Sequence, residues 1–262
     1  MMKRAAFLSI AIVPVFLVLM GWSTAMPSTA PQTSEGEIEP QADRILRQMG
    51  EYLRTAGEFT FRADITYDSL QVGGEEIQFG GVANVSVRRP DRLRVNFDGD
   101  ERRHRVFYDG SKFTLFDVAA DLYAVSEVSS TLDAAVDLVF DKYGFSVPIA
   151  DFVYADPYAT LIENVEAGFW VGLHSVDGVP SHHLFFSQDS IDWQIWIEDG
   201  PRPVPRKLLI TYKDDPDSRQ YTARLSGWNF QPRLSEHYFQ FHPPDGANEM
   251  EFLPTPETEP ER

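Results

Sequence analysis

The chain has 262 residues, no cysteine and a formal net charge of −17 at pH 7. The acidic balance excludes a general affinity for nucleic acid and disfavours adsorption to an anionic membrane surface. The lack of cysteine excludes disulfides, thiol catalysis and acylation at a cysteine, so the folded domain depends on its hydrophobic core.

The first 25 residues have the features of a cleavable secretory signal peptide. Lys3 and Arg4 form a basic start, residues 5–20 are apolar, and Ser23-Thr24-Ala25 offers small residues for cleavage. The apolar stretch is shorter than the roughly 20 residues that a spanning helix needs, so we expect cleavage rather than an uncleaved anchor. Because cleavage removes two basic residues and no acid, the net charge moves from −17 to −19.

A single domain is expected over residues 39–252, because no Gly/Ser linker and no repeat of fixed period interrupts this stretch. Residues 26–38 are rich in Ser, Thr, Pro and Glu, and residues 253–262 are rich in Pro and Glu. We therefore expect a disordered linker before the domain and a disordered acidic tail after it.

The predicted elements begin with an amphipathic helix over 39–56, in which apolar residues recur at steps of three and four. From residue 59 the period changes to two, which indicates strands, and Gly73-Gly74 is typical of a hairpin turn. The strands predicted before the next helix are 59–67, 77–87, 93–97, 103–108, 112–116 and 122–128.

The middle of the chain predicts helices. Residues 131–143 carry apolar side chains at helical spacing, a shorter helix is expected over 149–155, and one more turn is expected over 159–164. Strands then resume, and those predicted are 169–176, 182–186, 192–197, 207–212, 221–230 and a short last one at 238–241.

This order of elements predicts an α+β, mainly β, fold. So many strands in sequence favour a large curved antiparallel sheet, an unclosed half-barrel of about 11–12 strands, with helices covering its concave face. The 178–213 segment has large apolar side chains on both faces of its strands, so either the protein's own core or a ligand must cover it. The residues predicted to line a hydrophobic cavity are Phe61, Phe79, Phe97, Phe185, Trp193 and Ile195.

Arginine is concentrated in one stretch of this acidic chain: seven of the 18 arginines lie between Arg88 and Arg105. Arg92 and Arg94 alternate with apolar residues, so they project from the opposite face of their strand. Two interpretations stay open: a solvated face paired with neighbouring acids, or a docking patch for an acidic protein partner or a lipid head group.

No catalytic constellation stands out. The chain has no Gly-x-Ser-x-Gly motif, and adjacent His182 and His183 point to opposite faces of a strand and cannot readily share a metal, although His174 could join one of them. We therefore predict no enzyme, no metal site and no cofactor. A hydrolase, the remaining alternative of this kind, needs a Ser or Asp paired with one of these histidines.

The order of elements resembles the superfamily of periplasmic lipoprotein carriers and receptors typified by LolA and LolB. More specifically, the chain is similar over roughly 39–252 to a family of predicted periplasmic proteins of unknown function that is assigned to that fold. The motifs that carry this similarity are Arg89-Pro90, Tyr108-Asp109-Gly110, Asp156-Pro157-Tyr158, Val176 to Gly178, His182-His183-Leu184, Asp192 to Ile197, Pro205-Arg206-Lys207, Ile210 to Lys213, Trp228-Asn229 and Pro243 to Ala247.

The resemblance implies a fold and a periplasmic, Gram-negative compartment, and no catalytic residues. Carriers of the superfamily bind acyl chains between the concave sheet and a helical lid, which would here be the 131–143 helix. LolB-like receptors are acylated at a cysteine that this chain lacks, so we expect a soluble monomer that binds or carries an acyl chain, a lipid or a lipoprotein. Because another relative of this fold senses envelope stress, a protein-interaction or sensor module without a ligand is the alternative.

Overall fold

The computed structural model describes residues 36–128, 131–143, 147–215 and 217–251, all within one unit that spans Thr33–Arg262. The predicted signal peptide, most of the predicted linker and the predicted acidic tail lie outside the described residues.

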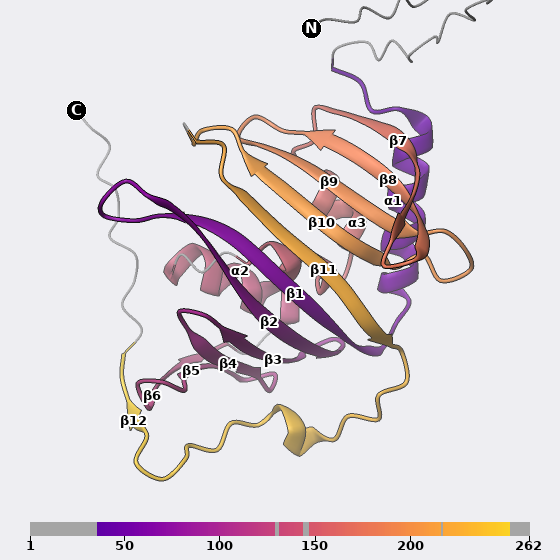
Figure 1. The fold of residues 1–262 in the computed structure, drawn as a ribbon. Helices are drawn as coiled ribbons and strands as arrows, with labels where there is room; N and C mark the ends of the chain where they lie inside the picture. The colour runs from indigo at the N-terminus through magenta and orange to yellow at the C-terminus, as the bar shows by residue number, and fades with distance from the viewer. Residues whose placement is uncertain (1–35, 129–130, 144–146, 216, 252–262) are drawn as a thin grey trace, which may run out of the picture. The chain divides into compact units, whose positions relative to one another are not determined.

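The described part of this unit contains three α-helices, two short 3-10 helices and twelve strands (Figure 1). The helices are α1 (Pro40–Arg54), α2 (Leu132–Tyr143), α3 (Pro157–Ile162), η1 (Pro148–Phe152) and η2 (Glu236–Phe239). The strands are β1 (Glu58–Leu70), β2 (Glu76–Arg88), β3 (Arg92–Gly99), β4 (Arg103–Tyr108), β5 (Lys112–Asp117), β6 (Leu122–Glu127), β7 (Ala167–Val176), β8 (Val179–Ser187), β9 (Ile191–Glu198), β10 (Pro205–Tyr212), β11 (Gln220–Asn229) and β12 (Asn248–Glu249).

All twelve strands form one sheet in the order β12-β6-β5-β4-β3-β2-β1-β11-β10-β9-β8-β7. Neighbouring strands are antiparallel except β12 and β6, which are parallel. The two ends of the sheet, β12 and β7, do not pair with each other, so the sheet stays open. The predicted fold class, a mainly β half-barrel with helices, is confirmed.

The turn between β7 and β8 is a two-residue hairpin loop. Asp177 and Gly178 connect β7 to β8 with φ angles of 51° and 80°. A two-residue hairpin loop needs positive φ at both central residues, which Asp tolerates and Gly adopts freely. The Asp177 carboxylate also pairs with Arg224 of β11, which ties this turn to the outer side of the sheet.

The sheet has an inner face, which carries the helices, and an outer face opposite to it. Alternate residues of β1, from Phe59 to Ile65, lie on the inner face and belong to the same core as the apolar stripe of α1. That stripe consists of Ala42, Ile45, Leu46, Met49 and Leu53. Its spacing of three and four residues buries one side of α1 against the sheet and leaves the other in water.

Two sequence predictions are wrong in detail. Residues 238–241 do not form a strand, because η2 (Glu236–Phe239) occupies this region, and the twelfth strand is β12. The 149–155 helix is a 3-10 turn over Pro148–Phe152, because Asp156-Pro157 begins a new helix shortly afterwards. Among the described helices, none has the length and apolar character needed to cross a membrane.

Candidate functional site

One half of the inner face is closed by helices. The α1 helix approaches β7, β8 and β9 closely and also contacts α3. Gly50 allows α1 to lie this close to α3, because a Cβ at this position would be 2.5 Å from the Cβ of Tyr158 in α3. Leu184, Phe186 and Ile195 are fully buried beneath this cover. The core of this half is filled by the protein's own side chains.

The inner face becomes progressively more open along β1 and β2. At one end, the inner-face residues of β1, which are Phe59, Phe61, Ala63 and Ile65, are at most 5% exposed. At the other end, Tyr67 and Phe79 face each other across the strands and are half-buried, and the next inner residue of β2, Ile77, is 41% exposed. The inner face therefore has a closed end and an open end, and we call the latter the mouth.

Aromatic residues continue across the sheet at the mouth. The register aligns Phe79, Tyr67, Tyr221, Ile210 and Trp193 in one row over five strands. Two polar atoms of this row, the Trp193 indole Nε1 and the Tyr221 hydroxyl, are buried and have no hydrogen-bond partner among the described residues. Burial raises the pKa of Tyr221 well above its usual range, so this phenol stays protonated and can donate a hydrogen bond.

The α2 helix covers the β1–β3 half less closely than α1 covers the other half. It begins at the closed end, where the Leu132 amide donates a hydrogen bond to the Pro90 carbonyl (2.8 Å). Leu132, Ala135 and Val139 are buried in the core, whereas Phe140 is 51% exposed. A half-exposed phenylalanine leaves apolar surface on the helix that no described residue covers.

Acidic groups gather where α2 meets η1. The Tyr154 hydroxyl donates to Asp137 (2.7 Å), and the Ala155 amide donates to Asp133 (2.9 Å). Burial raises the pKa of Asp151 in η1 to about 6. Burial, the bond to Asp137 and the nearby acids raise the pKa of Tyr154. This junction is therefore sensitive to pH.

The structure places five of the six predicted wall residues on the inner face. Phe61, Trp193 and Ile195 are at most 3% exposed and belong to the core, and Phe61 stacks on Trp228 with ring centroids 4.5 Å apart. Phe79 and Phe97 are only half-buried.

The sixth predicted wall residue, Phe185, lies on the outer face. It is aligned with Gln194 in β9 and stacks on Phe169 with ring centroids 5.0 Å apart. Its neighbour Phe186 is the residue that meets Trp193, with ring centroids 4.3 Å apart. Phe185 therefore does not belong with the other five.

The arginine-rich stretch on the outer face binds the chain's own C-terminal segment. We call residues 231–250 the strap; it crosses the outer face from β11 to β12 (Figure 1). Arg88 and Arg92 both pair with Glu236 of the strap. Arg94 donates a hydrogen bond to the Tyr238 carbonyl (3.1 Å). The alternation correctly placed Arg92 and Arg94 opposite the apolar face, but it gave no sign of the strap.

An open pocket of about 720 Å³ lies between α1 and the loop after β9. Its lining includes the imidazole of His182, whose Nε2 is 3.1 Å from Asp199. This is a pair of the kind that the hydrolase alternative needs, an Asp with one of the three histidines. No serine is among the described residues that line the pocket, and the adjacent Ser181 hydroxyl donates to the Val179 carbonyl.

His174 of β7 contacts His183 of the neighbouring strand β8. His174 Nδ1 lies 3.1 Å from His183 Nδ1, and His183 also bonds with Gln194 (2.9 Å). Within the described ranges, no three His, Cys, Asp or Glu side chains are grouped closely enough to hold a metal ion.

These features define a class of protein: an open, twelve-stranded antiparallel sheet whose inner face is covered by helices at one end and accessible at the other. The chain belongs to the family described as predicted periplasmic protein (DUF2092), which matches residues 42–253. No curated protein matches it.

Solved structures with a similar fold have little sequence in common with this chain. An uncharacterized conserved protein from Thermus thermophilus is 12% identical, with 80% of this chain and 99% of that one covered and a TM-score of 0.47. The lipoprotein LppX of Mycobacterium tuberculosis is 14% identical, with 75% and 98% covered and a TM-score of 0.45. A LolA superfamily protein from Nitrosomonas europaea is 12% identical, with 76% and 97% covered and a TM-score of 0.38.

Proposed function

We propose that this protein binds an apolar ligand on the inner face of the sheet, between the β1–β3 half and α2. An acyl chain, a lipid or the acyl groups of a lipoprotein has the required chemistry. The observation that carries the proposal is the change along the inner face from a closed end, where the inner-face residues of β1 from Phe59 to Ile65 are at most 5% exposed, to a mouth where Ile77 is 41% exposed.

Energetics favour an occupant at the mouth. Ile77, Tyr212 and Phe140 are large apolar residues left between 38% and 51% exposed. Covering apolar surface is worth roughly 25 cal/mol per Å², and each buried methylene of a ligand contributes about 0.8 kcal/mol. An acyl chain lying along Phe79 and Phe97 would therefore gain free energy without any conformational change in the closed end.

Hydrogen-bond donors suit a ligand that is apolar but carries a polar end. The unpartnered Trp193 indole and Tyr221 hydroxyl belong to the aromatic row at the mouth. A buried donor without a partner costs free energy, and a carbonyl or ester oxygen of a ligand would offset that cost.

Probe binding tests the proposal. Protein purified from periplasm and stripped of lipid is titrated with N-phenyl-1-naphthylamine, a neutral apolar dye that fluoresces when it leaves water. We expect saturable binding, and we expect Ile77→Asp to weaken it at least tenfold because a carboxylate at the mouth must be desolvated when the site fills.

The matched control is Val72→Asp in the β1–β2 turn, where the side chain is fully exposed. This variant should bind the dye as the wild type does. Absence of dye binding in the stripped protein, or equal affinity of the Ile77→Asp variant and the wild type, would contradict the proposal.

A further inference from the structure

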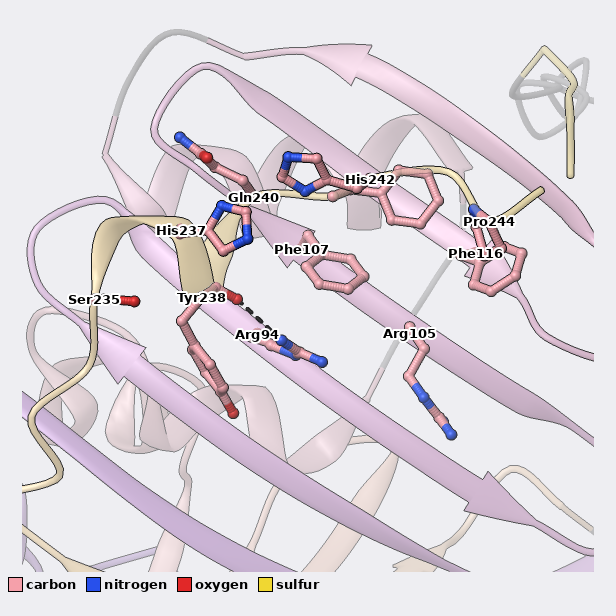
Figure 2. A pocket seen from close by; sticks show the side chains of 11 residues that line it. Arg94, Arg105, Phe107, Phe116, Ser235, His237, Tyr238, Gln240, His242 and Pro244 are labelled. Atoms are coloured by element: carbon pink, nitrogen blue, oxygen red, sulfur yellow. Dashed lines mark hydrogen bonds between the residues drawn. The ribbon is translucent and has the colours of Figure 1, made fainter.

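A second pocket lies on the outer face, where the strap crosses β3, β4 and β5 (Figure 2). Its volume is about 450 Å³, within the range of small-molecule sites. Phe107, Phe116 and Phe241 give it an apolar wall, with the Phe241 ring centroid 5.3 Å from that of Phe107 and 5.5 Å from that of Phe116. The three α-helices and the mouth lie on the other face of the sheet.

Arg94 brings an uncompensated positive charge into this pocket. It donates to two neutral oxygens, the Tyr238 carbonyl (3.1 Å) and Asn96 Oδ1 (3.3 Å), and no carboxylate pairs with it among the described residues. A guanidinium has five N–H donors, so three are left without a hydrogen-bond partner there. Two of these three belong to Nη2, which is not fully buried and has no hydrogen-bond partner among the described residues.

The other arginines nearby are already neutralised. Arg88 and Arg92 share Glu236, and Arg92 also pairs with Asp91 (2.8 Å). Arg105, which also lines the pocket, donates to Asp98 (2.7 Å). Of these four arginines, Arg94 is therefore the one without a carboxylate partner among the described residues, so its charge can pair with an anionic ligand.

Two aromatic rings hold the Arg94 guanidinium in place. Its Cζ lies 4.5 Å from the ring centroid of Tyr238 and 4.9 Å from that of Phe107. Cation–π contacts of this kind fix the position of the guanidinium while leaving its N–H edge free. Figure 2 shows His237 and His242 on the other side of the Phe107 ring, so polar groups stand on both sides of an apolar wall.

We propose that this pocket binds an amphiphilic oxyanion. Its carboxylate or phosphate would bind the free edge of Arg94, and its apolar body would pack against Phe107, Phe116 and Phe241. Because the chain carries a net charge of −17, long-range attraction does not favour anions, and recognition has to come from the local geometry. The inference does not depend on the ligand proposed for the inner face.

Calorimetric titration with octyl phosphate, octanoate, octanol and inorganic phosphate tests the chemistry. We expect both amphiphilic anions to bind and octanol to bind at least tenfold more weakly. The Arg94→Gln variant should lose at least tenfold in affinity for octyl phosphate, since a charge-assisted hydrogen bond is lost. The control Arg62→Gln removes an outer-face arginine already paired with Asp64 and should leave the affinity unchanged.

Amide chemical shifts of the wild-type protein give a readout that does not depend on the stability of any variant. Octyl phosphate should perturb Arg94, Phe107 and residues 235–242. Perturbations confined to the inner face would overturn the proposal, as would equal binding of octanol and octyl phosphate. Inorganic phosphate binding as tightly as octyl phosphate would also overturn it, because the apolar wall would then contribute nothing.

Discussion

Gly50 lies where α1 crosses α3, and only glycine permits the observed approach. A Cβ at this position would be 2.5 Å from the Cβ of Tyr158 and 2.8 Å from its backbone nitrogen. Backbone atoms cannot move aside as a flexible side chain can, so Gly50→Ala should force the two helices apart. We expect a loss of about 1–3 kcal/mol in the free energy of unfolding, measured with urea.

Gly57 provides the control for this substitution. Its added Cβ would meet no atom within 4 Å, and its φ is not positive. Gly57→Ala should therefore change stability by no more than about 0.5 kcal/mol. Equal effects of the two substitutions would contradict the close contact between α1 and α3.

Asp151 makes the fold less stable as its carboxyl ionises. Burial raises its pKa to about 6 in the folded protein, against roughly 3.9 in an unfolded chain. Between these values the folded state holds a proton that the unfolded state releases, so stability falls as pH rises through this window. Asp151→Asn should be more stable than the wild type at pH 7 by about 1–3 kcal/mol, and equal to it near pH 4.

Burial sets the direction of this effect. Two further carboxylates, Asp133 and Asp137, lie at the same junction through their bonds with Ala155 and Tyr154. Denaturant melts at both pH values would measure the difference, with exposed Asp245→Asn as a control that should show no change with pH. A pH-independent gain for Asp151→Asn would exclude ionisation as the cause.

The strap is an element whose structure depends on long-range contacts. Phe241 packs against Phe107, Phe116 and Tyr123, with ring centroids 5.2–5.5 Å apart. Phe241→Ala should cost about 2 kcal/mol and accelerate amide exchange over the strap. Phe140→Ala, which truncates a half-exposed ring, should cost less than 1 kcal/mol and leave exchange of the strap unchanged. Unchanged exchange in the Phe241→Ala variant would show that the aromatic cluster does not hold the strap.

Sequence patterns predicted the strands well and the strap poorly, for a physical reason. Alternation in β1 to β11 reflects burial of one face, which is a local signal. The strap instead is held by residues that lie more than 100 positions away in the sequence. Arg88 pairs with Glu236, and Arg94 donates to the Tyr238 carbonyl. The sequence did contain one signal for the strap. Phe107 and Phe116 are large apolar residues on the outer face, so another segment of the chain had to cover them.

Register explains why Phe185 was grouped with the wrong face. The sequence offers Phe185 and Phe186 as neighbours, and either could be the inner residue. The pairing of Phe186 with Trp193 depends on the turn between β8 and β9, and a shift of one residue exchanges the two faces. The sequence predicts which residues form each strand, but it does not predict which of their two faces is covered by the helices.

In the molecule as a whole, short segments from both ends of the domain protect the two edges of the open sheet. Beside β7, the Glu39 amide donates to the Gly168 carbonyl (2.8 Å). Beside β6, the Asn248 amide donates to Asp121 (2.9 Å), and the Met250 amide donates to Tyr123 (2.8 Å). Exposed edges favour pairing with other chains, so these contacts protect part of each edge of the open sheet.

Photo-crosslinking can locate an apolar ligand on the inner face, between the β1–β3 half of the sheet and α2. A fatty acid with a diazirine near its terminal methyl group is bound to the stripped wild-type protein, irradiated and mapped by peptide mass spectrometry. We expect crosslinks on inner-face residues of β1, β2 and β3, such as Phe79 and Phe97, and on α2. Crosslinks confined to the outer face, or no saturable crosslinking, would contradict it.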